Sequence, residues 1–416
     1  MFNVRSLVSI LLLSSSVIKS VSSADSSNRW SNQANVLEYQ NLGYEGSFRL
    51  VSSIDSKNDS CTCVLNEDTV PFSGTNSPFD GEVSVHIRGP INLQKFAFFT
   101  TDSYSSSDAS SNSSWTRRAY YDSASSSAEN VTFLGNVGDY VQCLGHALQY
   151  VDEDATSAST ESKVIDDVTI HSNEEFIIMS NLTCESSGWG KNCGVYRDGI
   201  PAYHGYDGTT KMFLFQFEAP MEDDTTMTVN NTASYNMPAI WLLNAHIPRT
   251  AQYPYNPNCS CWNSGCGEFD IFEVLNNTES THFFTTIHDY QGTDDIEGGL
   301  PIYGWLERTP NQVMKGGVVF DSNGVATVFI SSDTTFDDNL SSTDLSNWIS
   351  SATSNSSTGV SEDDEVDVRT LATVTAASTS SSKGDAAPQF LLLNGGNNSY
   401  WTLFSTTLLC AFFSLF

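Results

Sequence analysis

The octapeptide Gly-Glu-Phe-Asp-Ile-Phe-Glu-Val occupies residues 267–274, and in it three acids are set among large apolar side chains. On a β-strand, successive side chains point to opposite faces. Glu268 and Asp270 would therefore share one face, while the apolar residues between them pack into a core. The hydrophobic flanks favour a strand in a packed sheet over a flexible loop. The stretch thus predicts a β-rich fold with a row of carboxylates on one sheet face.

Glu273 is the third acid, and it lies five residues after Glu268, so a regular strand would turn it toward the core. One extra residue in a β-bulge at about residues 271–272 would return it to the acidic face. Like charges this close cannot all ionise freely, so at least one carboxyl pKa should rise. Retaining glycoside hydrolysis needs such a pair, one carboxylate as nucleophile and one protonated carboxyl as acid. We predict Glu268 as nucleophile, Glu273 as acid/base and Asp270 as the residue that orients and tunes Glu268.

Two simpler interpretations of the acidic row stay open. Acids that alternate along a strand are often only a solvated sheet face, and as a bare pattern that explanation is the more common one. Oxygen-rich loops also bind calcium. The apolar flanks argue against a calcium loop, because they predict a strand in a packed sheet.

The segment 281–288, Thr-His-Phe-Phe-Thr-Thr-Ile-His, has a second alternating pattern. A hairpin between it and residues 267–275 would bring His288 roughly opposite Glu268. His288 is then predicted to hydrogen-bond a catalytic carboxylate or a sugar hydroxyl. A purely structural histidine is an equally good interpretation.

Sugar-binding sites need flat apolar faces, and tryptophans supply them. Trp262 lies between two cysteines in a loop just before the acids, and we predict it as a substrate platform. Trp241 lies in the apolar run 239–244 and is a second substrate-binding candidate, although such a position is more often part of a core.

The rest of the chain supports an all-β fold. Residues 211–218 and 239–244 are apolar runs typical of buried strands, and Asn323-Gly324 between two apolar runs predicts a hairpin. Convincing amphipathic helices are scarce, and residues 138–151 are the best candidate. Many short strands without long helices predict an all-β sandwich.

Both ends of the sequence resemble targeting signals. Residues 1–23 combine Arg5, an apolar core and small residues at the end, which predicts a secretory signal peptide. The apolar tail that ends at Phe416 is too short to span a membrane and predicts a glycosylphosphatidylinositol (GPI) anchor signal. We predict Asn394 as the attachment residue and 395–416 as the propeptide.

The predicted organisation has three parts between these signals. Residues 24–114 form a β-region that ends in a Ser-rich linker over 101–114, and residues 115–336 form a catalytic β-sandwich. Residues 337–394 are rich in Ser and Thr and contain an acidic run, a composition that buries too little apolar surface to fold. We therefore interpret them as a solvated stalk.

The composition restricts the partners and the compartment. The formal net charge is −31, which disfavours a nucleic-acid partner. Of nine cysteines, Cys410 lies in the tail, and the remaining even number predicts disulfides in an oxidising compartment. Cys184 and Cys193 flank a short loop and are a candidate pair. Zinc is the alternative for Cys259, Cys261 and Cys266, but their spacing is not a usual zinc signature. Glycosylation acceptors are predicted at Asn58, Asn112, Asn130, Asn181, Asn230, Asn258, Asn276, Asn339 and Asn355.

These residues resemble a known family. The chain is similar to the fungal cell-wall proteins of the Tos-one-like glycosyl hydrolase family, which are described as circularly permuted 1,3-β-glucanases. The resemblance extends from about residue 39 to residue 330 and is carried by the segments 61–63, 86–90, 199–217, 237–254, 259–276 and 291–300. It is specific, because long stretches match beyond the acids.

The Glu-Phe-Asp-Ile-Phe-Glu core is also similar to the bulged catalytic strand of glycoside hydrolase family 16, whose jelly-roll enzymes cleave or rejoin β-glucans with retention. The resemblance implies a jelly-roll β-sandwich of the concanavalin-like type. It also implies a nucleophile at Glu268, an assisting Asp270, an acid/base at Glu273 and a hairpin histidine at His288. A permuted order relative to family 16 implies that residues 36–100 complete the sandwich, with a separate module as the alternative.

The sequence therefore predicts a monomeric, secreted, GPI-anchored enzyme of the cell wall and the outer face of the plasma membrane. It would be a retaining endo-β-1,3-glucan hydrolase or transglycosylase that needs no cofactor or metal. One alternative is a non-catalytic glucan-binding or structural wall glycoprotein, which the intact set of three acids disfavours. Another is a calcium-dependent adhesin.

Overall fold

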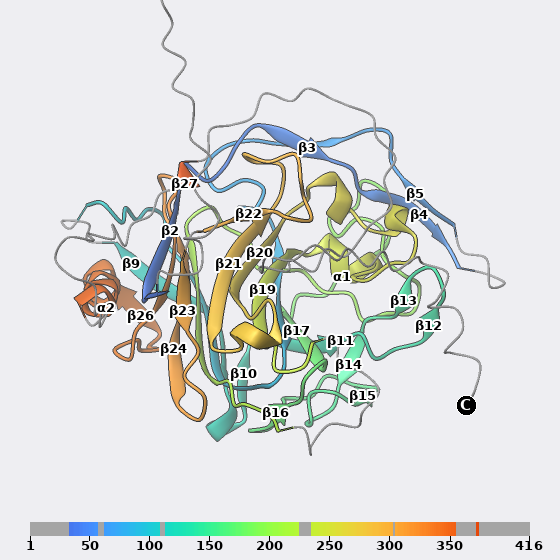
Figure 1. Ribbon diagram of the computed structural model, residues 1–416. Coiled ribbons are helices and arrows are strands. Elements are labelled where there is room, and N and C mark those ends of the chain that lie inside the picture. The colour runs from blue at the N-terminus through green and yellow to red at the C-terminus, as the bar shows by residue number, and fades with distance from the viewer. Residues whose placement is uncertain are drawn as a thin grey trace, which may run out of the picture. The chain divides into compact units, whose positions relative to one another are not determined.

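The computed structural model describes residues 33–56, 62–108, 113–223, 234–302, 304–354 and 372–373, all of them in one compact unit. Their strands build two large sheets, as Figure 1 shows. In order across it, the first sheet contains β1 (Gln33–Ala34), β23 (Trp305–Glu307), β21 (His282–His288), β20 (Glu268–Glu273), β19 (Ala239–Asn244), β7 (Val83–Arg88), β17 (Glu175–Met179), β11 (Thr132–Gly135), β14 (Gln149–Val151) and β15 (Ala158–Ser159), with β22 (Leu300–Pro301) beside β21.

The second sheet lies against the first. In order, it contains β10 (Ser127–Glu129), β9 (Ser114–Asp122), β8 (Ile91–Thr100), β18 (Lys211–Glu218), β24 (Val313–Phe320), β25 (Ala326–Ile330), β2 (Val36–Gln40) and β27 (Ala372–Thr373), with β16 (Thr169–Ile170) beside β8 and β26 (Asn339–Ser341) beside β9. Three small pairs lie outside these sheets: β12 (Tyr140–Val141) with β13 (Gly145–His146), β3 (Gly46–Phe48) with β6 (Val70–Phe72), and β4 (Val51–Asp55) with β5 (Thr62–Leu65).

Helices are few and short in the described part of the chain. The α-helices are α1 (His246–Thr250) and α2 (Ser342–Ser354), and the 3₁₀ turns are η2 (Ser123–Ser125), η3 (Pro257–Cys259), η4 (Trp262–Ser264) and η5 (Asn277–Glu279). The prediction of an all-β sandwich is therefore confirmed.

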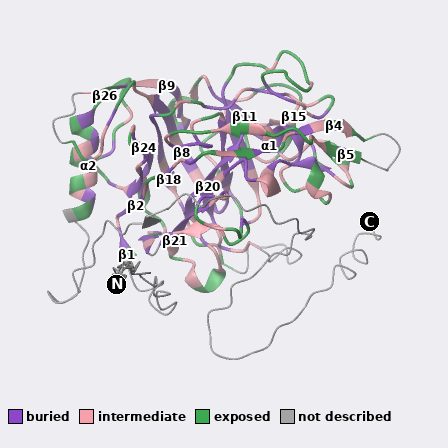
Figure 2. Cartoon of the chain, turned by 90° about the horizontal axis from the view of Figure 1, so that it is seen from above, coloured by how far each residue is buried: buried purple, intermediate pink, exposed green. Residues whose placement is uncertain are grey.

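The core lies between the inner faces of the two sheets. Phe213 and Phe215 of β18 pack in one apolar cluster with Ile240 of β19 and Phe269 of β20. The alternation of a strand puts these residues inside and sends their neighbours outward. Figure 2 shows the buried residues gathered on the strands in the middle of the molecule and exposed residues on peripheral loops. The core thus fixes which side chains of β19 and β20 face out of the sandwich.

Strands from before residue 101 are part of both sheets. β7 lies between β19 and β17 in the first sheet, and β8 pairs with β18 in the second. β2 pairs with β25, which lies almost 300 residues later in the chain. The N-terminal strands consequently supply one neighbour of the strand that precedes the acids.

The local predictions had mixed outcomes. Residues 211–218 and 239–244 form β18 and β19, and the Asn323-Gly324 hairpin joins β24 to β25, so these predictions are confirmed. The helix predicted over 138–151 is wrong, because that segment forms β12, β13 and β14. Its apolar residues do not share a face: Leu144, Leu148 and Val151 pack into three different clusters.

Two boundaries predicted from composition need correction. The Ser-rich segment over 101–114 is not a free linker, because Tyr104 is buried and the Ser106 hydroxyl donates to Asp321 Oδ2 at 3.0 Å. The stalk does not begin at residue 337, because residues 339–354 form β26 and α2. Four apolar residues in this stretch are buried, which the Ser-rich composition concealed: Leu340, Leu345, Trp348 and Ala352.

Several predictions fall outside the described residues. They are the signal peptide, the anchor propeptide with Asn394, and the acceptors Asn58, Asn112, Asn230 and Asn355. Among the described acceptors, Asn181, Asn258 and Asn339 are exposed, whereas the Asn130 and Asn276 amides are hydrogen-bonded to neighbouring groups.

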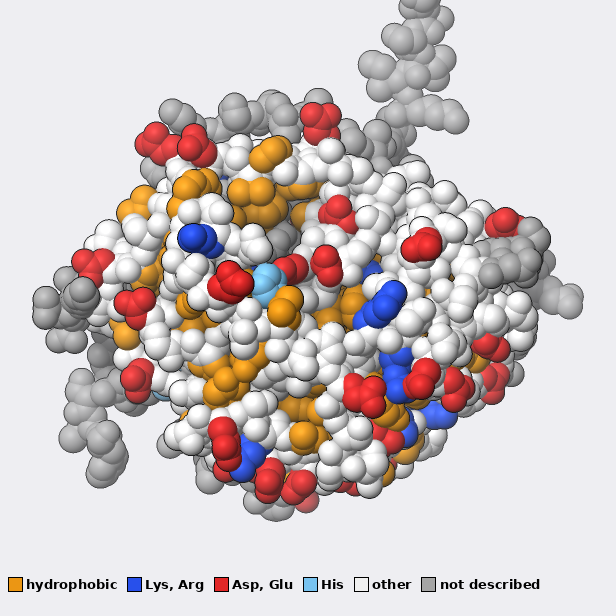
Figure 3. Space-filling view, turned by 180° about the vertical axis from the view of Figure 1, so that it is seen from behind, with side chains coloured by type: hydrophobic (Ala, Val, Ile, Leu, Met, Phe, Trp, Pro, Cys, Tyr) orange, Lys and Arg blue, Asp and Glu red, His pale blue; other side chains and the backbone are white. Residues whose placement is uncertain are grey.

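No helix among the described residues is long and apolar enough to cross a membrane. Figure 3 shows acidic side chains spread over one face of the molecule, many near its rim.

Substitution Trp348→Ala tests whether α2 is part of the folded domain. Trp348 is 4% exposed, so its loss should lower the free energy of unfolding by about 3–5 kcal/mol. Urea unfolding followed by circular dichroism would measure the change. Asn347→Ala, at an exposed position of the same helix, is the matched control and should change stability by less than about 0.5 kcal/mol. Equal stability of the two variants would contradict the packed position of α2.

Candidate active site

A β-bulge in β20 brings the third acid onto the same face as the first two. Asp270 pairs with Thr286 of β21 and Glu273 pairs with Phe284, so three steps along β20 match two steps along β21. The extra residue lies between Asp270 and Glu273, where Ile271 and the residue after it are fully buried. The bulge predicted at residues 271–272 is therefore confirmed.

The partners of the three acids on β19 show that they share a face. Read in strand order, these partners are the alternate residues Ala239, Trp241 and Leu243. Alternate residues of a strand point to one side of the sheet. The side opposite the core therefore carries Glu268, Asp270 and Glu273, and we call it the acidic face.

Glu268 is held by the loop that precedes it. The Trp262 Nε1–H group donates to Glu268 Oε2. Trp262 begins the short turn η4, and a disulfide between Cys261 and Cys266 closes this turn over five residues of sequence. The bridge fixes the loop, so the indole N–H is set in place for the carboxylate. Trp262 is thus a partner of Glu268 as well as a ring at the surface.

Asp270 forms an ion pair with His288. His288 Nε2 lies 3.1 Å from Asp270 Oδ2, and His288 Nδ1–H donates to the Ile296 carbonyl at 2.7 Å. Since a carbonyl only accepts, the proton on Nδ1 is fixed and Nε2 faces the carboxylate. His288 also pairs with Glu268 across the strands, as the sequence predicted. The imidazole therefore lies between two acids.

Glu273 has a cationic partner that sequence reasoning missed. Arg88 of β7 donates from Nη2 to Glu273 Oε1 at 3.2 Å and from Nε to the Met237 carbonyl at 2.8 Å. On its other side Arg88 pairs with Glu175 of β17. The sequence did contain a signal, because the alternation of Val83 to Arg88 puts the arginine side chain on the face of the strand that does not carry the valines. That Arg88 reaches Glu273 follows only from the sheet order, in which β7 lies two strands from β20.

Burial and crowding raise the pKa of both glutamates. Loss of hydration and the charge of Asp270 raise the pKa of Glu268 to about 8, against the lowering effects of His288 and Trp262. The same two causes raise the pKa of Glu273 to about 7, against the lowering effect of Arg88. Burial alone would lower the pKa of His288, but the hydrogen bond and charge of Asp270 and the charge of Glu268 raise it to about 10. The acidic face therefore binds protons more tightly than free carboxyl groups do, and it does so beside a charged imidazole.

Trp241 lies on the acidic face but offers little surface to a ligand. It is 5% exposed and pairs with Asp270, and its ring centroid lies 5.2 Å from that of His86 with the two rings tilted by 31°. Its ring belongs to an apolar cluster with Phe48 and Ile247. Trp241 therefore packs as a buried ring beside the acids. It is not an exposed platform for a sugar ring, which was one interpretation of its position in the sequence.

The cysteines form disulfides. Bridges join Cys63 to Cys259, Cys184 to Cys193 and Cys261 to Cys266. The predicted 184–193 pair is therefore confirmed. The zinc alternative for residues 259, 261 and 266 is wrong, because their sulfurs belong to two different bridges. Among the described residues, the groups close enough to hold a metal consist of these bridged cysteines with Cys143 or His204, and the acidic face is not one of them.

A β-sandwich with two glutamates on one bulged strand is an architecture suited to glycoside hydrolysis. The chain belongs to the family of cell wall protein YJL171C/Tos1. The C-terminal part of that family matches residues 113–348 and the N-terminal part matches residues 35–101. The family description places its members in the cell wall.

Curated relatives match most of the chain. Candida albicans PGA52 is 45% identical over 97% of this chain and 99% of its own length. Saccharomyces cerevisiae YJL171C is 49% identical over 73% of this chain and 77% of its own length. S. cerevisiae TOS1 is 38% identical over 58% of this chain and 50% of its own length. All three are named probable circularly permuted 1,3-beta-glucanases. No solved structure gives a significant match.

Substitution Glu268→Gln should make the stability of the protein less sensitive to a rise in pH between the ordinary pKa of a glutamate, 4.5, and the raised value of about 8. Because the folded state raises the pKa of Glu268 from 4.5 to about 8, it holds this proton more tightly than the unfolded chain does. Wild-type stability is therefore lost as pH rises through this window. The variant should gain on the order of 1–3 kcal/mol relative to wild type between pH 4 and pH 8. Thermal unfolding at both pH values measures the difference, with exposed Glu45→Gln as control. A parallel shift at the two pH values would contradict the raised pKa.

Proposed function

We propose that the acidic face cleaves or rejoins β-1,3-glucan by a retaining mechanism. The single observation that carries the proposal is the bulge that puts Glu268 and Glu273 on one sheet face with Asp270 between them. The names of the relatives support β-1,3-glucan as the substrate. The same names support an enzyme over a non-catalytic wall protein.

In the first step, the Glu268 carboxylate attacks the anomeric carbon while Glu273 gives its proton to the leaving glycosidic oxygen. Trp262 N–H and the positive charge of His288 both favour the ionised form of Glu268. The raised pKa of Glu273 keeps a proton available for the leaving group. Asp270 holds the imidazolium in place, and its charge adds to burial in raising the pKa of both glutamates.

In the second step, Glu273 takes a proton from the attacking hydroxyl, which releases the sugar from Glu268. Attack by water gives hydrolysis, and attack by a sugar hydroxyl gives transglycosylation. Because the pKa of both glutamates is raised, the pKa values do not tell the nucleophile from the acid. We assign the two roles from the order of the glutamates along the strand and from the resemblance to family 16.

The location that we propose is the cell wall with a GPI anchor at the outer face of the plasma membrane. The sequence at the two ends supports it, and so does the family description as a cell wall protein. The proposal is independent of the chemistry at the acidic face.

Azide rescue distinguishes the two glutamates. With a dinitrophenyl β-glycoside of a short β-1,3-glucan, whose leaving group needs no proton, Glu273→Ala should lower kcat about 10²–10⁴-fold because the base that activates water is lost. Azide should then restore turnover and give a β-glycosyl azide. Glu268→Ala should be inactive, and azide should give the α-anomer, because it then attacks the anomeric carbon directly. Nuclear magnetic resonance identifies the anomer.

Glu307→Ala, at an exposed position of β23, which lies two strands from β20, is the control and should retain activity. Exchange of the two anomers would reverse the assignment of roles. Wild-type product profiles equal to those of both alanine variants would rule out the enzyme and favour a glucan-binding wall protein.

Substitution Arg88→Met should move the alkaline limb of the pH profile upward. Arg88 lowers the pKa of Glu273 through its charge and its hydrogen bond, so its loss leaves the acid protonated to higher pH. The apparent pKa in kcat/KM should rise by about one unit, measured on soluble β-1,3-glucan. Arg118→Met, at an exposed position of β9 in the other sheet, is the control. An unchanged limb would show that Glu273 is not the group that titrates there.

A further inference from the structure

Three exposed tyrosines gather beside the acidic face. Tyr140 of β12 is 53% exposed, and Tyr253 and Tyr255, in the loop between α1 and η3, are 51% and 65% exposed. The side chains of Tyr140 and Tyr255 interact. We call these three residues the tyrosine patch. A group of large, solvent-exposed aromatic rings is typical of a binding surface.

The tyrosine patch is connected to the catalytic acids by a row of side chains. The Tyr253 hydroxyl lies 2.9 Å from both carboxylate oxygens of Glu175. Glu175 pairs with Arg88, and Arg88 hydrogen-bonds Glu273. The row crosses β20, β19, β7 and β17, three strand spacings that amount to roughly 14 Å. That span exceeds one sugar ring, so a polymer held at Glu273 can extend over the sheet to Tyr253.

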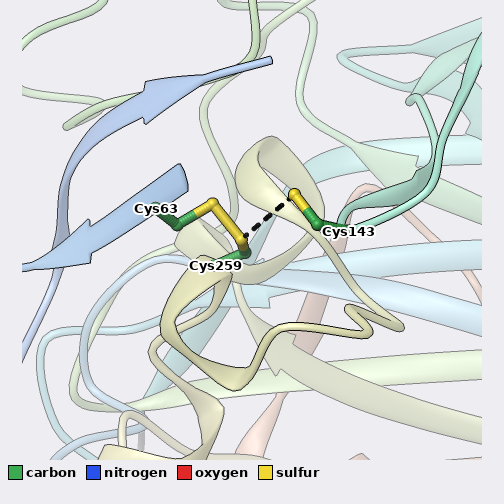
Figure 4. A group of neighbouring side chains, drawn as sticks. All are labelled: Cys63, Cys143 and Cys259. Atoms are coloured by element: carbon green, nitrogen blue, oxygen red, sulfur yellow. Dashed lines mark hydrogen bonds between the residues drawn. A yellow bond between two sulfur atoms is a disulfide. The ribbon is translucent and has the colours of Figure 1, made fainter. Parts of the chain in front are cut away.

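Disulfide chemistry fixes the loop that carries two of the rings. Cys63 of β5 is bridged to Cys259, and the Cys143 sulfur lies 3.9 Å from the Cys259 sulfur, as Figure 4 shows. Asn256 N–H donates to the Cys143 carbonyl at 3.2 Å, which ties the tyrosine loop to the β12–β13 hairpin. A surface that is ordered before its ligand arrives loses less entropy on binding.

The β12–β13 hairpin is held from its other side by a buried arginine. Arg197 donates to the Gly145 carbonyl at 3.0 Å and to the Asp139 carbonyl at 3.1 Å. The hairpin lies near α1 and the β11–β14 end of the first sheet, as Figure 1 shows. The hairpin that carries Tyr140 is therefore also held in place by hydrogen bonds.

The chemistry of the patch fits an uncharged polysaccharide. A pyranose has apolar faces and hydroxyl edges, and a tyrosine has an apolar ring and a polar tip. The carboxylate beside Tyr253 and the net charge of −31 would repel an anionic chain. The row of side chains that links the patch to Glu273 favours the same polymer that is cleaved at the acidic face.

We propose that Tyr140, Tyr253 and Tyr255 form distal subsites that bind further glucosyl units of the β-1,3-glucan held at the acidic face. This inference rests on the proposed function and adds to it a preference for long chains. Glucan that reaches the patch gains contacts that a short oligosaccharide does not make.

The test compares kcat/KM for soluble laminarin with kcat/KM for laminaritriose. Tyr255→Ala and Tyr140→Ala should each lower the ratio of laminarin to laminaritriose by roughly three- to tenfold, because each removes one ring contact. Tyr120→Ala, at a half-buried aromatic position of β9 in the other sheet, is the matched control. Thermal unfolding confirms that each variant is folded.

Affinity electrophoresis in laminarin gels gives a second readout that needs no turnover. The two patch variants should lose retardation relative to wild type, and Tyr120→Ala should not. An unchanged substrate ratio together with unchanged retardation, in an active protein, would overturn the subsites and leave the proposed function standing. A wild-type protein that neither cleaves nor is retarded by laminarin would overturn both.

Discussion

The chemistry of this protein depends on one extra residue in one strand. Without the bulge between Asp270 and Glu273, the period of a strand would turn Glu273 into the space between the sheets. That space is filled by aromatic and aliphatic side chains, and an ionisable group there would be costly. The bulge allows Ile271 and Phe272 to remain in the core while both glutamates face outward. Packing and chemistry are therefore satisfied by the same local irregularity.

The acidic face brings carboxylates together at an electrostatic cost that neighbouring elements reduce. Arg88 from β7, His288 from β21 and Trp262 from η4 each contact a different acid. Each partner comes from a separate part of the chain, so the site exists only when the first sheet and its loops are assembled. Burial, together with the remaining repulsion, raises the pKa of both glutamates above its usual value. A site that must both attack and donate a proton uses this remaining repulsion.

Disulfides arrange the loops around the acidic face. The bridge between Cys261 and Cys266 fixes the Trp262 turn, and the bridge between Cys63 and Cys259 joins an N-terminal strand to the loop after Tyr255. Loops lack the regular backbone pairing that holds a strand in place, so covalent links replace it. The two bridges thus restrict the loops that carry Trp262 and Tyr255.

The sequence by itself determined the sandwich, the strands 211–218 and 239–244, the bulge and the order of the three acids. Those features depend on short-range patterns of apolar and polar residues, which the alternation of a strand makes legible. Tertiary structure alone decided that Arg88 lies between Glu273 and Glu175, that Trp241 is buried beside the acids and that residues 339–354 fold. The physical reason is that neighbours across a sheet come from distant parts of the chain. Pairing and burial between such segments leave no local periodicity to read.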